Sequence, residues 1–502
     1  MPVNSVSLLD SDLFNVQADN ATRDERISLS YHRARAIARA YAFNTDDVLR
    51  LTGKFWEFHQ DLIHTRDSAA FTLLAIQYNL CAGTLAPFLK GRADLRSLME
   101  KLLSFEVSGQ FLLTEVGHGL DAHALETVAV LLPGGDFDLH TPHPDAAKYM
   151  PPTSPIAGFP RVGIVIARLL VDGEDRGVRP FIVWLNDGWR MCKGVSAKVL
   201  PERAGSKPLD HCITTFNHVR LARSALLGDV DKPADLRKNF QSTIWRVHIG
   251  TLSLTTVLIP TLKRSVFVAG KYSLRRHIRD PNNNPRPIIS FRTQQRPVLH
   301  TLAQIAVFEP YAQESIRQYT DSTIPYSMRQ GVAAAFKAVL SQATQESLFA
   351  LAERCGAQGL FGYNNIIDNQ LEVRGSSIAE GDTLVLSITI GHRMAYEAAL
   401  DAAVSPDLLA LYEAGVVLRH SGWFAENTAL DSESQLDMEL RAMNTILPRL
   451  EQLLDSTGAD RYCTAPIVSN KSWEAFTRIL KVHEGNASDG VQDDKVGATS
   501  KL

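Results

Sequence analysis

The segment CGAQGLFGYNNIIDNQLEVRGSSIAEGDT, from Cys355 to Thr383, combines two features that a ligand pocket needs. The first is a pair of glycines, Gly356 and Gly359, which let the backbone approach a bulky ligand because no Cβ intervenes. The second is Glu380, which precedes the apolar run 384–390. A carboxylate in such surroundings can have a raised pKa and act as a general base.

The same residues also have a purely structural interpretation. Glycine turns would precede a helix whose first turn holds Glu380, Asp382 and Thr383 as caps. This segment alone leaves both interpretations open.

The segment resembles the acyl-CoA oxidase and acyl-CoA dehydrogenase superfamily of flavoproteins, in which a glycine-rich segment precedes a catalytic Glu-Gly pair. Gly356 and Glu380 lie 24 positions apart, as in that family. The resemblance implies that Glu380 is the catalytic base and that Gly356, Gln358 and Gly359 contact the cofactor FAD. Three positions depart from the oxidase pattern: Ala357, Gln358 and Leu360.

A second block, TEVGHG at 114–119 followed by LET at 125–127, resembles the oxidase signature Thr-Glu-Met-Gly-His-Gly … Leu-Glu-Thr. The resemblance implies that Thr114 hydrogen-bonds the flavin ring edge and that Gly117 and Gly119 admit backbone N–H groups to it. The run 117–122 also fits a GxGxxA dinucleotide fingerprint. That alternative is disfavoured, because a β region follows where a Rossmann unit needs a helix.

A third block, KYMPP at 148–152, lies where the oxidases carry Lys-Trp-Trp-Pro-Gly. The resemblance implies that Lys148 and Pro152 border the cofactor. Tyr149 and Met150 replace two tryptophans, and Pro152 replaces a glycine whose N–H faces the flavin, which proline cannot supply. A proline-rich surface loop is the competing interpretation.

A fourth block, YSLRR at 272–276 with FRTQQ at 291–295, resembles the oxidase pattern Tyr-Ser-x-x-Arg-Arg … Phe-x-Thr-Gln-Gln. The resemblance implies that Arg276 and Gln295 bind the pyrophosphate and adenosine part of FAD across a subunit interface, so that the protein is at least a homodimer. An arginine fork suits a diphosphate. On its own, the basic pair would be an exposed helix face.

Composition narrows the class of protein. The chain has 502 residues, 45% hydrophobic and 21% charged, and a net charge of −3, which gives no support for nucleic-acid binding. Five dispersed cysteines without a CxxC pair indicate reduced thiols, and the histidines show no metal-ligand spacing. We expect no membrane span, because no uninterrupted apolar run approaches about 18 residues.

Hydrophobic periodicity predicts an α+β fold, the acyl-CoA dehydrogenase-like arrangement that the resemblance also implies. It predicts helices that include 23–41, 46–64 with a cap at Thr45, and 326–354, strands that include 137–140 and 161–171, and a proline-rich loop at 280–287. Residues 1–109 form a helical N-terminal domain and 110–230 a central antiparallel β domain with the flavin site. Residues 231–483 form a C-terminal helical domain with further FAD contacts and the base, and 484–502 a disordered tail. The chain resembles a shortened oxidase.

The tail ends in Ser500-Lys501-Leu502, which the peroxisomal import receptor reads as an address. We therefore expect a peroxisomal protein.

The resemblance implies an FAD-dependent oxidase that introduces an α,β double bond into an acyl-CoA and passes electrons to O2, giving H2O2. Three alternatives stay open. One is a related desaturase or oxidase that tailors a specialised metabolite, which the changes at Ala357, Tyr149, Met150 and Pro152 favour. The second is a dehydrogenase with a protein electron acceptor. The third is a non-catalytic peroxisomal binding protein of the same fold.

Overall fold

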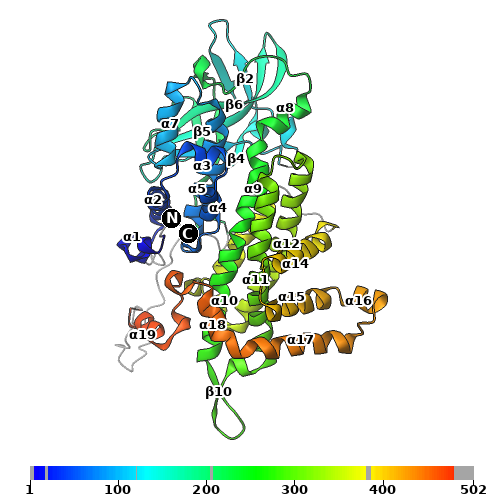
Figure 1. Cartoon of the computed structure of the whole chain (residues 1–502). Helices are drawn as coiled ribbons and strands as arrows, with labels where there is room; N and C mark the ends of the chain where they lie inside the picture. Colours follow the sequence, from blue (N-terminus) through cyan, green and yellow to red (C-terminus); the bar gives the residue numbers. More distant parts are fainter. Residues whose placement is uncertain (1–4, 17–20, 120, 204–206, 380–385, 480–502) are drawn as a thin grey trace, which may run out of the picture.

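The computed structural model describes residues 5–16, 21–119, 121–203, 207–379 and 386–479. The two main sheets lie at one end of an elongated molecule, and long helices run from them to the β10 hairpin at the other end (Figure 1). Helices α15–α17 project sideways from these long helices. The α+β class predicted from the sequence is confirmed. Glu380 and Ser500-Lys501-Leu502 lie outside the described residues.

The N-terminal helices follow the predicted pattern with one break. Helix α2 has the predicted bounds, Arg23–Tyr41, and begins with a capping box between Thr22 and Glu25. The helix expected over 46–64 is instead α3 (Thr45–Leu49), α4 (Gly53–His59) and a 3-10 turn. The observed cap is Asn44, one residue before the expected Thr45, and it forms a capping box with Asp47.

Helix α5 (Ser68–Ala75) continues as a π-helix, Ile76–Ala82, and α7 (Ala93–Leu103) closes this region. The buried Gln77 side chain donates to the carbonyls of Leu102 (2.6 Å) and Val107 (2.8 Å). Its oxygen accepts from the N–H of Gly109. The π-helix thereby sets where the first strand begins.

The larger sheet is mixed, whereas the sequence predicted an antiparallel domain. Strands β1 (Ser108–Leu112) and β2 (Val128–Leu131) both run parallel to β5 (Arg161–Val171), one after the other along the same edge. They share a direction because the 113–127 loop leaves that edge and returns without reversing the chain. This loop carries the second motif block.

The remaining strands are antiparallel to their neighbours. Strands β3 (Phe137–His140), β6 (Glu174–Asn186) and β9 (Val219–Leu221) complete the larger sheet. The smaller sheet has the order β4-β8-β7, with bounds Lys148–Pro152, His211–Phe216 and Val195–Val199.

The C-terminal region is helical as predicted, apart from its expected loop at 280–287. That segment takes part in a hairpin, β10 (His277–Arg279) with β11 (Pro285–Pro287). The helices, in chain order, are α8 (Leu236–Thr243), α9 (Trp245–Thr256), α10 (Leu258–Arg275), α11 (Arg292–Thr320), α12 (Tyr326–Arg354), α13 (Ile366–Ile378), α14 (Leu386–Asp401), α15 (Pro406–Arg419), α16 (Ser421–Asn427), α17 (Ser432–Ile446), α18 (Leu450–Ser456) and α19 (Asn470–Arg478).

Two helical segments, 68–88 and 245–275, are long and apolar enough to cross a membrane, although the sequence predicted none. Within the most apolar windows of these segments, 83% and 89% of the residues are buried inside the protein. Their apolar side chains therefore form core rather than an outward surface.

A buried polar network joins α2 to the sheets. Asp210 accepts from Tyr31 Oη (2.9 Å) and Ser154 Oγ (2.8 Å) and lies 3.3 Å from the guanidinium of Arg161. Arg161 is fully buried and also lies over the Tyr31 ring. Its charge therefore depends on one carboxylate.

We expect Asp210→Ala to lower the free energy of unfolding by about 3–5 kcal/mol, because it leaves a buried arginine uncompensated. Urea denaturation followed by circular dichroism measures the change. The matched control is Asp437→Ala, which removes an exposed pair with Arg441 on α17 and should cost less than about 0.5 kcal/mol. Equal effects of the two substitutions would contradict the assignment.

Candidate functional site

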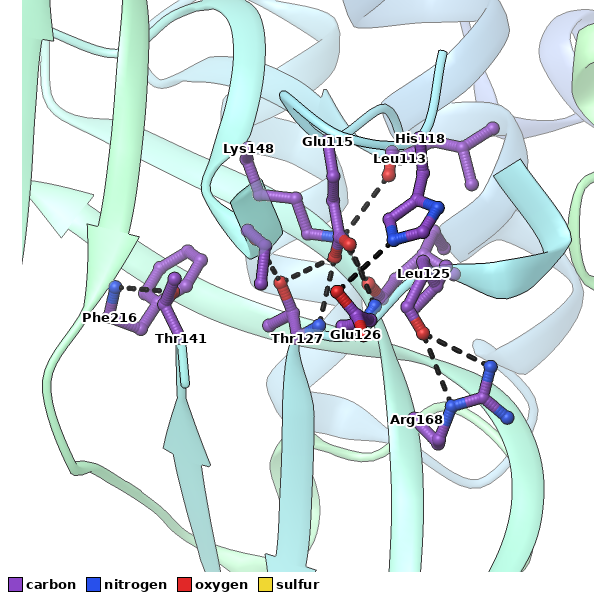
Figure 2. Close-up of polar contacts among 12 residues, drawn as sticks. Leu113, Glu115, His118, Leu125, Glu126, Thr127, Thr141, Lys148, Arg168 and Phe216 are labelled. Atoms are coloured by element: carbon purple, nitrogen blue, oxygen red, sulfur yellow. Dashed lines mark hydrogen bonds and ion pairs between the residues drawn. The ribbon is translucent and has the colours of Figure 1, made fainter. Parts of the chain in front are cut away.

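The 113–127 loop is organised by the buried carboxylate of Glu115 (Figure 2). One oxygen accepts from Lys148 Nζ (2.8 Å), Thr127 N (2.9 Å) and Thr127 Oγ1 (2.7 Å). The other accepts from Glu126 N (2.7 Å). Burial opposes ionisation of Glu115, but the Lys148 ammonium and the other donors outweigh it and hold the pKa of this carboxyl below its usual value.

Lys148, which the sequence placed beside the cofactor, has its side chain fully inside the protein. Besides Glu115, its ammonium donates to the carbonyls of Ile166 (2.8 Å) and Leu113 (3.2 Å). All three of its protons therefore have acceptors on the chain. Its side chain can therefore support a ligand site only indirectly, by holding Glu115 and the carbonyls of Leu113 and Ile166 in place.

Thr114 and the two glycines of this loop lie at or near the surface. The Thr114 carbonyl accepts from Tyr149 N (2.9 Å), which holds the loop against β4. Gly117 donates its N–H to the Asp145 carbonyl (2.8 Å), and a Cβ on Gly117 would come within 3.0 Å of the Asp145 side chain. That N–H is thus already used, contrary to the expected cofactor contact. A Cβ on Gly119 would meet only open space.

The third motif block forms an exposed apolar rim next to Thr114. Tyr149 is 39% and Met150 37% exposed, while Pro152 is buried. Met150 has φ +75°, and the pairing of β4 with β8 shifts register between Tyr149 and Pro152. The resulting bulge turns two large side chains outward. Lacking an N–H and lying inside, Pro152 could border a ligand only through neighbouring atoms.

Sequence reasoning missed a cluster at the edge of this rim. Glu126 Oε2 lies 3.2 Å from His118 Nε2 and 2.9 Å from His143 Nε2. His118 and Glu126 were visible inside the matched motif. Nothing in the sequence indicated that His143, 17 positions further on, would meet them.

Arg276 and Gln295 come together at the far end of the helices. The Arg276 carbonyl accepts from Ile288 N (2.8 Å), and Gln295 Nε2 donates to the next carbonyl, that of Ile289 (2.9 Å). Arg276 is exposed at the end of α10, whereas Gln295 is buried in the first turn of α11. The hairpin therefore brings the two residues to one place, with the arginine facing outward.

The glycine segment lies at the same end, at the C-terminus of α12. Gln294 Nε2 donates to the Arg354 carbonyl (2.7 Å), which joins α11 to this terminus. Gly356 has φ +57°, the left-handed conformation that ends a helix, and a Cβ there would meet open space. A Cβ on Gly359 would lie 2.0 Å from the Ala352 carbonyl, so this close approach requires glycine.

Gln358 is turned into its own loop rather than outward. Its side-chain oxygen accepts from Tyr363 Oη (3.1 Å) and Asn364 Nδ2 (3.0 Å). Its backbone carbonyl also accepts from Asn364 (2.8 Å). The side-chain amide nitrogen is the group of Gln358 left to meet a ligand.

The predicted site residues thus form two groups, one on the sheets and one at the β10 end of the long helices, at opposite ends of the elongated molecule (Figure 1). Thr114, Gly117, Gly119, Lys148 and Pro152 form the sheet group. Arg276, Gln295, Gly356, Gln358 and Gly359 form the helix-end group. Helices α9 and α10 run between them, and their 31-residue span corresponds to about 45 Å at 1.5 Å per residue.

The immediate surroundings of the predicted base are partly described. The buried ammonium of Lys337 on α12 donates to the carbonyl of Ala379, the residue before Glu380. Lys337 was not singled out from the sequence, because an interior helix position gives no motif. Among the described residues, no group of three or more His, Cys, Asp or Glu side chains has the arrangement of a metal site.

Comparisons with known proteins agree on one family. A model described as the acyl-CoA oxidase C-alpha1 domain matches residues 248–394. Human peroxisomal acyl-coenzyme A oxidase 3 is 27% identical over 296 residues, covering 53% of this chain and 42% of that protein. The chain spans about half the length of the curated relatives it matches, with 42%, 50% and 51% of their lengths covered in three of them.

Solved structures support the fold. Acyl-CoA oxidase 1 from Yarrowia lipolytica superposes with a TM-score of 0.78 at 18% identity, covering 95% of this chain and 89% of that chain. Acyl-CoA oxidase-1 from Caenorhabditis elegans, solved in complex with FAD and ATP, gives 0.74 at 16% identity, again with 95% and 89% covered.

We expect Glu115→Gln to cost about 3 kcal/mol at pH 7, because the buried Lys148 loses its counter-charge. Since the folded-state pKa of Glu115 is lowered, the carboxylate stabilises the protein above its unfolded pKa of about 4.3 and ceases to do so as the pH falls through the folded value. The gap between variant and wild type should therefore be constant from pH 7 to about 5 and narrow as the pH falls below about 4.3.

Denaturant titrations at pH 7, 5 and 3.5 measure this gap. The control is Glu100→Gln on the exposed face of α7, which should stay within about 0.5 kcal/mol of wild type. A gap for Glu115→Gln that is the same at all three pH values would show that the charge of this carboxylate does not matter.

Proposed function

We propose, from its similarity to acyl-CoA oxidases, that the chain is an FAD-dependent oxidase that introduces an α,β double bond into an acyl thioester. The observation that carries the proposal is the family spacing of Gly356 and Glu380, with Gly356 at the C-terminus of α12, where the Arg354 carbonyl accepts from Gln294, the neighbour of Gln295 on α11. The curated relatives are named acyl-CoA oxidases, and one neighbouring structure contains FAD.

The residues present fit FAD, with some changes from the family pattern. Arg276 offers an exposed guanidinium for a diphosphate, and Gly356 leaves open space beside its backbone. At the sheet end, Thr114 and the apolar rim of Tyr149 and Met150 offer a partly polar, partly flat surface to a ring system. Lys148 and Pro152 would act indirectly, by holding the strand ends that carry this surface.

The chain's own chemistry would centre on one proton. Glu380 would remove the proton from the carbon next to the thioester carbonyl. Bound FAD would supply the acceptor for the hydride that leaves the neighbouring carbon, and O2 would take up the electrons as H2O2. Lys337 supports Glu380 indirectly, since it binds the carbonyl of Ala379 and so restrains the backbone entering the catalytic residue.

A second candidate is a related oxidase that tailors a specialised metabolite. The rim favours it, because exposed Tyr149 and Met150 replace two large tryptophans and so change the surface that a substrate would meet. Measuring H2O2 release from a panel of acyl-CoA thioesters and matching free acids separates the two candidates. Release only with free acids or other metabolites would favour the second.

We also propose a peroxisomal location, which the names of the relatives from human and Arabidopsis thaliana support.

We expect Glu380→Gln to retain the fold and the flavin but to slow flavin reduction by at least about 10²–10⁴-fold, the usual contribution of a general base. The amide is nearly isosteric but does not take up the proton. Anaerobic stopped-flow mixing with the acyl-CoA that gives most peroxide follows the bleaching of oxidised flavin.

Glu372→Gln is the matched control for this experiment. Glu372 lies on α13 eight positions before Glu380, and burial raises the pKa of its carboxyl. Its side chain accepts from Lys207 N (2.5 Å), which gives it a structural partner. Glu372→Gln should reduce its flavin at close to the wild-type rate. If Glu380→Gln bleached its flavin at the wild-type rate and Glu372→Gln did not, Glu372 would be the base instead.

The separation of the two groups supports a homodimer with composite sites. One FAD cannot span about 45 Å of α9 and α10 to reach both groups of one chain. The helix-end group of one subunit would instead meet the sheet group of its partner. The exposed guanidinium of Arg276 is placed for such a role.

We expect Arg276→Ala to lower the flavin content of the purified protein and to raise the dissociation constant for FAD by about 10-fold, as loss of a charge-assisted contact would. Absorbance at the flavin band and titration of the apoprotein measure both. Arg279→Ala, on the same hairpin with its guanidinium bound to the Asn283 carbonyl, is the control. A fully flavinated monomer by light scattering would contradict the composite site.

A further inference from the structure

A cavity of about 780 Å³ shares no lining residue with either group of the proposed flavin site. Its walls include α2, residues Glu202, Lys207 and Pro208, the start of α13, and α19. None of the residues proposed to contact FAD lines it. Its volume falls within the usual range for pockets that bind small organic molecules.

The charges on the cavity wall are not balanced. Its cationic residues are Arg26, Arg33, Arg66 and Lys207, and its carboxylates are Asp67, Glu202 and Asp368. Two of the cations are paired: Arg33 with Asp67 at 3.1 Å, both buried, and Arg26 with Glu202 at 3.1 Å.

Arg66 and Lys207 have no ion pair within 4 Å among the described residues, although Glu372, which does not line the cavity, interacts electrostatically with Lys207. Arg66 donates only to carbonyls, those of Phe14 (2.5 Å) and Tyr462 (3.3 Å). Burial and the nearby cations Arg264 and Arg33 lower the pKa of Arg66 to about 10. Burial is the larger cause, and the two neighbouring cations add to it, so a bound anion would favour the charged form of Arg66.

The rest of the wall combines polar side chains, among them Asn15, Asn365 and Thr464, with apolar and aromatic ones. Phe14, Tyr363 and Phe476 line it, and the rings of Tyr363 and Phe476 lie 4.6 Å apart. Phe476 belongs to α19, which covers one side of the cavity without burying any residue of its own. A helix attached so lightly can move aside to admit a ligand.

We propose that this cavity binds an organic anion with an apolar body, whose carboxylate or phosphate head lies at Arg66 and Lys207 and whose body lies against Tyr363 and Phe476. This site is separate from the proposed flavin site. It is nevertheless connected to it, because Tyr363 Oη donates to Gln358 Oε1 (3.1 Å). A ligand against Tyr363 therefore touches the side chain that orients Gln358.

The test is isothermal titration of the full, flavin-loaded chain with decanoate and decyl phosphate, with decyltrimethylammonium and inorganic phosphate as comparison probes. We expect at least one of the two amphipathic anions to bind, and the cation and bare phosphate to bind at least 10-fold more weakly. The stronger of the two anions identifies the preferred head group. Saturation with the acyl-CoA substrate should leave this binding unchanged.

Two substitutions test the location. Lys207→Glu reverses one charge at a half-buried position, and Ala475→Trp, on the exposed side of α19, fills the cavity from its cover. Each should weaken binding of the preferred anion at least 10-fold. Lys471→Glu on α19, which does not line the cavity, is the matched control and should bind as wild type does.

Four results would overturn the proposal. These are no anion binding up to millimolar concentration, equal binding of the cation, unchanged binding in Ala475→Trp, and displacement of the anion by the acyl-CoA substrate. The last would place the anion in the substrate site. Because the anion titrations themselves contain no acyl-CoA and need no turnover, a failure here is distinguishable from a failure of the proposed oxidase activity.

Discussion

The buried ion pair between Glu115 and Lys148 holds the sheet end of the proposed site in shape. Burying two charges is costly, and the cost is offset only when further hydrogen bonds satisfy both partners. Here Lys148 donates to three acceptors, and Glu115 accepts four hydrogen bonds from three residues, Glu126, Thr127 and Lys148. The pair therefore fixes how the loop leaves β1, and with it the position of Thr114. Lys148, which the motif predicts at the cofactor, would therefore act on the site indirectly, by holding the loop that carries Thr114.

The length of α9 and α10 imposes the second constraint. These helices are core elements, buried along most of their span, so they act as a rigid spacer between the sheets and the β10 hairpin. The residues proposed to contact one FAD are thus carried at both ends of a spacer too long to bring them together. If they do bind one FAD, two chains must associate, so the proposed cofactor site and the proposed homodimer stand or fall together.

The bounds of several helices and strands could be predicted from the sequence, whereas strand pairing and contacts between distant residues could not. The bounds of α2, α12, β3 and β5 follow from local periodicity and caps, which act over a few residues. The parallel pairing of β1 and β2 with β5 could not be predicted, because strand direction depends on where a 15-residue loop returns. The His118–Glu126–His143 cluster and the Lys337 contact with Ala379 likewise depend on tertiary packing.

The glycines of the 356–359 segment show why a motif is ambiguous before a structure is known. Gly356 is needed to end α12 in the left-handed conformation, and Gly359 is needed because the Ala352 carbonyl comes so close. Both would be glycine in a protein without any ligand. What distinguishes them is the side that faces away from the packing: at Gly356 this side is open, whereas at Gly359 the chain itself fills it. Of the two, only Gly356 therefore keeps backbone surface that a cofactor could approach. The need for glycine at position 359 is explained by packing against Ala352 and does not require a ligand.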